Sequence, residues 1–133
     1  MLIGFEHVGM TVSDMDRAID FYCGLLGLTL RYRKRNAGGE VAFVDAGGGM
    51  LEMVAPDNEV GRFRDVPTSE AGLRHVTLAY DNVDEMIALL QAKGVEIAER
   101  PRDAHNKAMI SRVAFVRDPD GVLVELIERA ADR

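Results

Sequence analysis

The stretch HVGMTVSDMDRAIDFYCGLLGLTL, residues 7–30, has the pattern of a strand followed by an amphipathic helix. At its start, apolar residues alternate with other residues, as in a strand with one buried face. From Met15 onward, apolar side chains recur at the i, i+3, i+4, i+7 spacing of a helix with one buried stripe. We expect Ser13 or Asp14 to cap this helix and Gly27 to end it.

The same pattern returns at residues 75–97, HVTLAYDNVDEMIALLQAKGVEI. A shift of 68 positions (75 − 7 = 68) superposes His7 on His75 and the apolar stripe of the first helix on that of the second. Asn82 is the expected cap of the second helix, and Gly94 is its expected stop. The chain is therefore predicted to contain an internal repeat.

Three strand-like runs separated by turn signals follow each predicted helix. The segments FVDAGGGMLEMV and FVRDPDGVLVELI are counterparts, and they align Glu52 with Glu125. The sequence thus predicts an α+β fold of two tandem βαβββ modules in a single domain. The predicted bounds are 1–56 for module one, 57–71 for the linker and 72–133 for module two.

Composition narrows the class of protein. The chain has 133 residues, of which 47% are hydrophobic and 29% charged, as expected for one globular domain. Its apolar runs are far shorter than the roughly 20 residues that cross a bilayer. Its net charge of −6 would repel the phosphate backbone of a nucleic acid. The single cysteine, Cys23, suits a reducing compartment. We expect a soluble, cytoplasmic protein that binds neither nucleic acid nor membrane.

Two histidines and two glutamates occupy matched positions of the repeat. Strand alternation places His7 and His75 opposite the apolar face of their strands, on a face lined by small residues. Glu52 and Glu125 stand among apolar neighbours on the last strand of each module, where an ionised carboxylate needs compensation. A lone strand histidine is ordinarily a packed or hydrogen-bonded residue, and either glutamate alone could face solvent. The matched set of two imidazoles and two carboxylates instead predicts a divalent metal site.

These residues carry a family resemblance. The stretch 7–30 and the segment AFVRDPDGVLVELIE resemble the opening and closing motifs of the vicinal oxygen chelate superfamily. That superfamily holds glyoxalase I, methylmalonyl-CoA epimerase, extradiol dioxygenases and the fosfomycin and bleomycin resistance proteins. The resemblance covers nearly the whole chain. It implies that the two modules form a cup-shaped mixed sheet around a metal, with the helices on the outer face.

The order of the four candidate ligands is similar to that of glyoxalase I. The resemblance implies Ni, Co, Zn or Mn as the ion, held by His7, Glu52, His75 and Glu125, or Fe in an oxygenase. It also implies a homodimer, and it leaves open whether the site lies within one chain or is shared by two.

The resemblance further implies a metal-dependent lyase or isomerase. Such an enzyme removes a proton alpha to a carbonyl, with Glu52 and Glu125 as candidate bases, and stabilises a metal-bound enediolate. Thr11 stands where glyoxalase-like enzymes usually have an arginine that reaches a glutathione carboxylate, so glutathione is not implied. Lys107 stands where those enzymes often contact substrate, and His105 lies in the same predicted loop. The expected partner is a small molecule, such as a thiol or CoA adduct.

Three alternatives remain open at the level of the sequence. One is an epimerase similar to methylmalonyl-CoA epimerase. Another is an Fe(II) extradiol-type dioxygenase that uses His7, His75 and Glu125, for which Glu52 would be a surplus ligand. The third is a protein that sequesters a drug or metabolite without turnover.

Overall fold

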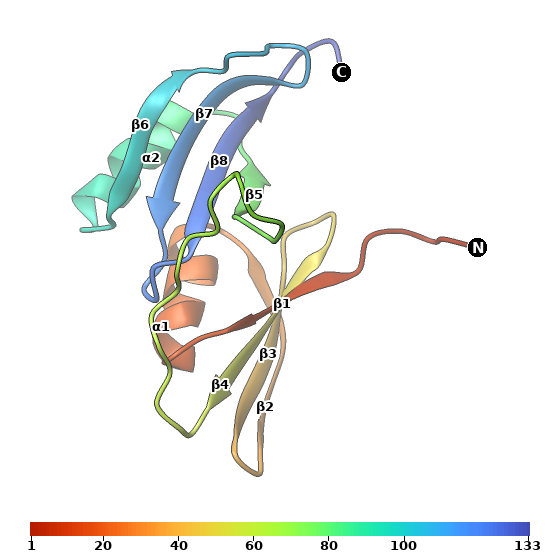
Figure 1. The fold of residues 1–133 in the computed structure, drawn as a ribbon, viewed down its shortest axis with the longest axis vertical. Helices are drawn as coiled ribbons and strands as arrows, with labels where there is room; N and C mark the ends of the chain where they lie inside the picture. Colours follow the sequence, from red (N-terminus) through yellow and green to blue (C-terminus); the bar gives the residue numbers. More distant parts are fainter. The chain divides into compact units, whose positions relative to one another are not determined.

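The computed structural model describes residues 1–133, which form two compact units, residues 1–62 (unit 1) and 63–133 (unit 2). Each unit holds one four-stranded mixed sheet, with helical residues between its first and second strands (Figure 1). The predicted α+β fold with two βαβββ modules is therefore confirmed. No helix has the length and apolar character needed to cross a membrane.

Unit 1 has the strand order β1-β4-β3-β2, in which β1 runs parallel to β4 and the other neighbours are antiparallel. Its elements are β1 (His7–Thr11), α1 (Met15–Ile19), η1 (Asp20–Leu25), β2 (Thr29–Asn36), β3 (Gly39–Asp45) and β4 (Met50–Pro56).

Unit 2 repeats this topology with the order β5-β8-β7-β6, again with one parallel pair, β5 and β8. Its elements are β5 (Val76–Ala79), α2 (Val83–Ala92), β6 (Ile97–Asp103), β7 (Ile110–Arg117) and β8 (Leu123–Arg129). In both units the first and last strands of the module therefore lie side by side.

The helix caps confirm the predicted boundaries. The side chain of Asp14 accepts a hydrogen bond from the backbone N–H of Arg17, and that of Asn82 accepts one from Glu85. Gly27 and Gly94 follow the helical segments with φ angles of 90° and 82°. Only glycine adopts this left-handed conformation readily, which explains why both helices stop there.

The first helix differs from the prediction of one continuous α-helix. After α1, residues 20–25 form the π-helical turn η1, and the N–H of Leu26 donates to the carbonyl of Phe21 at 3.0 Å, five residues back. The wider turn buries Phe21 beside Tyr22 and leaves Leu25 half-buried. Regular α-helical spacing counted from Met15 places Leu25, and not Phe21, on the buried stripe.

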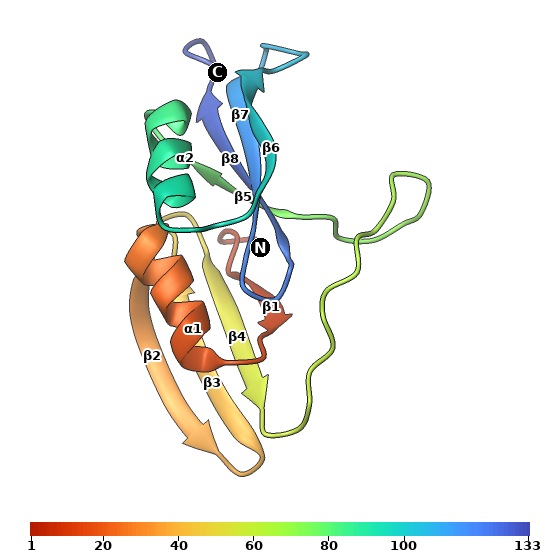
Figure 2. The ribbon, with the colours of Figure 1, turned by 90° about the vertical axis from the view of Figure 1, so that its left-hand side faces the viewer.

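Each helix covers one face of its own sheet (Figure 2). Along β4, Leu51, Met53 and Ala55 are buried, whereas the alternate residues from Met50 onward face the other side. In β8, Val124 and Leu126 are buried in the same way. The opposite face of each sheet is the one that carries the histidine and the glutamate.

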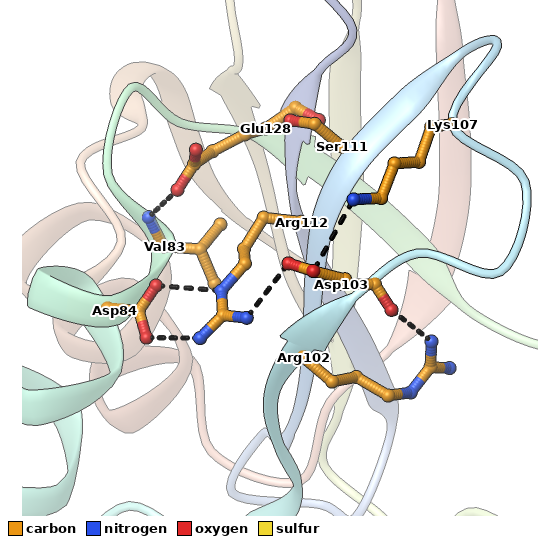
Figure 3. A network of polar contacts seen from close by, with 8 residues as sticks. All are labelled: Val83, Asp84, Arg102, Asp103, Lys107, Ser111, Arg112 and Glu128. Atoms are coloured by element: carbon orange, nitrogen blue, oxygen red, sulfur yellow. Dashed lines mark hydrogen bonds and ion pairs between the residues drawn. The ribbon is translucent and has the colours of Figure 1, made fainter.

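Polar contacts fasten α2 to the strands of unit 2 (Figure 3). The guanidinium of Arg112 on β7 donates to both carboxylate oxygens of Asp84 on α2, at 2.7 and 2.9 Å, and to Asp103 at 3.2 Å. The carboxylate of Glu128 on β8 accepts the N–H of Val83 at 2.8 Å. The helix N-terminus is thus held by side chains from two strands as well as by its own cap.

Candidate metal centre

In unit 1, the parallel pairing of β1 with β4 brings His7 and Glu52 together. Glu52 lies opposite Gly9, two residues beyond His7 and on the same face of the sheet. The Nε2 atom of His7 lies 4.0 Å from Oε1 of Glu52. About a third of each of these side chains is exposed, which leaves both able to contact a bound ion.

In unit 2, the pairing of β5 with β8 repeats this arrangement. Glu125 lies opposite Thr77, again two residues beyond the histidine. The Nε2 atom of His75 lies 3.4 Å from Oε1 of Glu125. The Glu125 side chain is 14% exposed, against 34% for Glu52, so the carboxylate of unit 2 is the more enclosed.

A phenylalanine packs against each histidine. The rings of His7 and Phe43 have centroids 5.5 Å apart and planes at 85°, and His75 and Phe115 have the same distance and angle. Each phenylalanine lies opposite the glutamate of its unit in the antiparallel ladder. Edge-to-face packing is a favoured geometry for such rings, so each phenylalanine supports one orientation of the imidazole.

The two units differ at one position next to the glutamate. In unit 2 the hydroxyl of Thr77 donates a hydrogen bond of 2.8 Å to Oε1 of Glu125. The corresponding residue of unit 1 is Gly9, which has no side chain to donate. Glu52 is therefore left with His7 as its polar side-chain contact.

The donor set suits a divalent transition metal. Each unit offers one imidazole nitrogen and one carboxylate on the same sheet face, a mixed N and O set. Within this structure no group of three or more His, Cys, Asp or Glu side chains has an arrangement that could hold a metal ion. Each unit therefore supplies two candidate ligands.

The three predicted substrate-binding residues lie at the end of one strand and in one loop, and no hydrogen bond or ion pair joins any of them to the histidine and glutamate pair of its own unit. Thr11 is exposed at the far end of β1, on the same face as His7. His105 and Lys107 lie in the loop between β6 and β7 and are exposed. The Nζ atom of Lys107 lies 3.4 Å from a carboxylate oxygen of Asp103. The loop ends where β7 begins at Ile110, which pairs with Arg129 on β8. Arg129 lies four residues after Glu125 on that strand (129 − 125 = 4).

Two other groups that could act as nucleophiles are held in their protonated forms. Burial raises the pKa of the Cys23 thiol above its usual 9.0. Burial also raises the pKa of the Tyr80 hydroxyl to about 12. Neither group is ionised to a useful extent at neutral pH, which disfavours thiolate or phenolate chemistry.

Sequence reasoning missed the supporting residues around the candidate ligands. Phe43 and Phe115 begin the two segments that had been aligned to match the glutamates, so the repeat itself contained their signal. The contact of Thr77 with Glu125 joins residues 48 positions apart and depends on the strand register. The sequence carried no comparable signal for that contact.

Comparison with known proteins identifies a family profile that matches residues 4–126, described as the Glyoxalase/Bleomycin resistance protein/Dioxygenase superfamily. Two curated relatives are a lactoylglutathione lyase of Escherichia coli O157:H7 and a probable chloroplastic lactoylglutathione lyase of Arabidopsis thaliana. The first is 31% identical over 126 residues, covering 92% of this chain and 90% of the relative. The second is 34% identical over 126 residues, and the chain spans only 35% of its length.

Solved structures share the fold. Glyoxalase I from Zea mays superposes with a TM-score of 0.78 at 26% identity, covering 96% of this chain and 45% of the maize chain. An antibiotic-binding protein from Streptomyces sp. CB03234 superposes with a TM-score of 0.71 at 27% identity, covering 96% of this chain and 97% of that one. One architecture thus serves an enzyme and a binding protein.

Proposed function

Because the chain belongs to the Glyoxalase/Bleomycin resistance protein/Dioxygenase superfamily, we propose that it is a metal-dependent lyase or isomerase of the glyoxalase type. The observation that carries the proposal is the pairing of one histidine with one glutamate in each unit, at matched ladder positions and beside matched phenylalanines. A packing role for the histidines would not require an acidic partner at the same register in both modules.

The proposed ligands are His7 and Glu52 from unit 1 and His75 and Glu125 from unit 2. Ni, Co, Zn and Mn all accept such imidazole and carboxylate donors. When bound, the ion would supply Lewis-acid polarisation of a substrate carbonyl.

The carboxylates carry the proposed chemistry. Glu52 or Glu125 takes the proton from the carbon next to the substrate carbonyl, and the electrons of that C–H bond form the C=C bond of an enediolate. The carbonyl electrons move onto its oxygen. The same carboxyl group then returns the proton to the former carbonyl carbon. The hydroxyl proton of the first carbon passes to the former carbonyl oxygen, and a new C=O bond forms at the first carbon. The net reaction moves hydrogen within the substrate and needs no oxidant or reductant.

The proposed substrate is a small molecule with adjacent oxygen functions on two carbons, such as the thiol adduct of a 2-oxoaldehyde. In this proposal Lys107 attracts an anionic group and Thr11 contacts the substrate from the His7 face. His105 gates the pocket from the same loop as Lys107. The likeness to lactoylglutathione lyases supports the reaction class. Because Thr11 replaces the arginine that usually reaches glutathione, the proposal does not specify which thiol forms the adduct.

A second candidate function is sequestration of a small molecule without turnover. The likeness to the Streptomyces antibiotic-binding protein over nearly the full length of both chains favours it. The four candidate ligands weigh against it, because simple enclosure of a drug requires no matched histidine and glutamate pairs.

The test is metal analysis followed by activity measurements. The full chain is loaded separately with Ni²⁺, Co²⁺, Zn²⁺, Mn²⁺ and Fe²⁺, dialysed, and assayed with 2-oxoaldehyde adducts of several thiols and with acyl-CoA epimers. We expect a stoichiometric divalent ion and isomerisation of one thiol adduct. A protein that retains no ion above background contradicts the proposal. Epimerisation alone, oxygen uptake with Fe²⁺, or binding without turnover would establish the epimerase, dioxygenase or sequestration alternative in its place.

The assembly proposed here is a homodimer. Sedimentation at micromolar concentration is expected to give twice the chain mass of 14.6 kDa. A monomeric mass would contradict the dimer.

A further inference from the structure

We propose that Lys34, on the outermost strand of unit 1, determines substrate specificity by binding the anionic group of a small molecule. Its neighbours Tyr32 and Val54 contact the apolar body of the same molecule. The inference rests on the proposed function, because it names the substrate class for the sheet face that carries His7 and Glu52. It concerns unit 1 alone.

Strand register places Lys34 on the face of the candidate metal ligands. Two neighbouring rows of ladder partners cross unit 1 on the face that carries His7. The first row comprises Tyr32, Phe43, Glu52 and Gly9. The second comprises Lys34, Val41, Val54 and Thr11. Ladder partners point to one face, and so do residues two positions apart on a strand. The Cα atoms of Lys34 and Glu52, two strands and two residues apart, are therefore separated by about 12 Å.

The basic run of β2 leaves Lys34 without an acidic partner. Each arginine of the strand forms an ion pair, at 2.9–3.1 Å: Arg31 with Asp45, Arg33 with Glu40 and Arg35 with Asp57. Lys34 is exposed and forms no ion pair in the structure. An anion can thus approach its ammonium group without breaking an existing contact.

The surface between Lys34 and Glu52 is apolar and partly open. The Tyr32 side chain is 48% exposed and that of Val54 is 39% exposed. The ring of Tyr32 meets that of Phe43 edge to face, with centroids 6.3 Å apart. An exposed ring and an exposed valine beside an unpaired cation suit a molecule with an apolar body and one anionic end.

Unit 2 has the same two rows with different chemistry. They comprise Glu99, Phe115, Glu125 and Thr77 in the first, and Arg102, Val113, Ile127 and Ala79 in the second. Arg102 corresponds to Lys34, and Glu99 corresponds to Tyr32. The two side chains of unit 2 form an ion pair with each other, and the central apolar residues of the second row are only 4% and 6% exposed. Both modules therefore carry a cation at this position, and only that of unit 1 is unpaired above an open surface.

A lysine on an edge strand can also serve to prevent association of strands. β2 is the edge strand of unit 1, so this role has to be separated from anion binding. The three arginines already place charge along the same edge. Protection of the edge depends on charge alone and requires neither a particular ligand nor the ring of Tyr32.

The first test measures binding to the metal-free full chain, in which no ion can hold a carboxylate. The probes are phenylbutyrate and its neutral analogue phenylbutanol, each titrated by calorimetry at low and moderate salt. We expect the native protein to prefer phenylbutyrate, and salt to reduce that preference because the ion pair is exposed. Lys34→Gln should weaken phenylbutyrate binding by about 5-fold, the scale of an exposed ion pair, and leave phenylbutanol binding unchanged. Lys34→Arg should retain the preference.

The control variants separate this site from other cations. Lys93→Gln removes one positive charge from an exposed lysine of unit 2, and it should bind both probes as the native protein does. Tyr32→Ala should weaken both probes, because it removes the ring that contacts their apolar body, whereas Tyr32→Phe should weaken neither. Sedimentation of Lys34→Gln reports whether the edge strand has begun to associate.

The second test uses the metal-loaded protein and two adducts of one 2-oxoaldehyde. The mercaptoacetate adduct carries a carboxylate, and the mercaptoethanol adduct does not. We expect Lys34→Gln to raise the KM for the charged adduct by about 5-fold and to leave its kcat, and both constants for the neutral adduct, unchanged. An unchanged KM for the charged adduct would overturn the role of Lys34 in substrate choice.

The outcomes also separate this inference from the function on which it rests. Equal affinity of the native protein for phenylbutyrate and phenylbutanol overturns the inference, and so does equal affinity of native protein and Lys34→Gln for phenylbutyrate. A loss in Lys107→Gln that is absent in Lys34→Gln overturns it by placing the anion at the loop. Association of Lys34→Gln with undiminished phenylbutyrate binding assigns the lysine to edge protection and overturns it as well. A native protein that retains no divalent ion, yet binds phenylbutyrate through Lys34, overturns the proposed function and leaves the anion site standing.

Discussion

His75 meets Phe115 edge to face, with ring centroids 5.5 Å apart and planes at 85°. This contact lies directly beside Glu125, the ladder partner of Phe115. The aromatic ring therefore supports the imidazole at the position where Nε2 faces the carboxylate. The counterpart in unit 1 has the same distance and angle, which indicates that both modules orient their histidine by the same means.

The first prediction concerns this support. Phe115→Leu keeps an apolar side chain but removes the ring that fixes the imidazole, so we expect Co²⁺ affinity to fall by about 3- to 10-fold. Phe63→Leu is the matched control, because Phe63 belongs to the same unit and makes no ring contact with His75. Titration calorimetry on both variants measures the difference. Equal affinities would show that the ring contact does not position the ligand.

The second prediction concerns the ligands themselves. His7→Ala and Glu125→Ala each remove one donor, and we expect each to abolish stoichiometric binding of a divalent ion. Cys23→Ser should retain it, because the half-buried thiol is protonated at neutral pH and belongs to neither pair. Metal analysis after dialysis checks all three variants. Retention of a full equivalent by His7→Ala would remove that residue from the ligand set.

The third prediction separates the two carboxylates in catalysis. Replacing either glutamate by glutamine keeps its size and removes its ability to take a proton. The metal-loaded glutamine variant of the carboxylate that takes the proton should lose turnover by roughly 100-fold or more, the scale of general base catalysis. The glutamine variant of the other carboxylate should lose less turnover at equal metal occupancy.

Rates are compared after metal content has been measured, so weakened binding is not counted as lost chemistry. Exchange of the substrate's carbon-bound hydrogen with deuterated solvent provides an independent measurement. Near-native turnover of Glu52→Gln together with an inactive Glu125→Gln would assign the base to Glu125.

The fourth prediction concerns the polar network that holds α2. The hydrogen bond from Arg112 lowers the pKa of Asp84 below its usual 3.8. The folded state favours the ionised carboxylate of Asp84. Its contribution to the stability of the fold is therefore fully present at pH values above the ordinary pKa of 3.8, and it is lost as the pH falls through the lowered pKa. Arg112→Gln should therefore lower the Tm of the metal-free protein modestly at pH 7, and the difference from native should disappear as the pH falls through the lowered pKa of Asp84.

Arg129→Gln is the control for this prediction, because Arg129 is exposed and has no ion pair in the structure. It should leave Tm unchanged across the same range. A deficit of Arg112→Gln that persists undiminished at the lowest pH would mean that packing of the arginine, and not its charge, holds the helix.

Much of the fold could be predicted because each module repeats the same local signals. Alternation fixed the strands, the apolar stripe fixed the helices, and Asp14 and Asn82 fixed where the helices begin. The pairing of each histidine with its glutamate followed from the repeat and the topology. Such features depend on residues close in the chain or on the duplication itself.

Other features depend on contacts that the sequence does not encode locally. The link between Thr77 and Glu125 needs the exact register of β5 against β8. A π-turn has no distinct apolar period within a helix of this length, so regular α-helical spacing was the natural expectation. The placement of Lys107 beside Asp103 is likewise set by the loop conformation and not by any motif.

The π-turn η1 also records how the two halves of the chain have diverged in length. From the cap to the terminating glycine, the first helix spans 13 positions (27 − 14 = 13) and the second spans 12 (94 − 82 = 12). One additional residue in a regular α-helix would rotate everything after it by about 100°. The hydrogen bond from the N–H of Leu26 to the carbonyl of Phe21, five residues back, accommodates the additional residue within a single wider turn. The one-residue difference in length between the two helices is therefore accommodated locally, and both modules keep the same strand order.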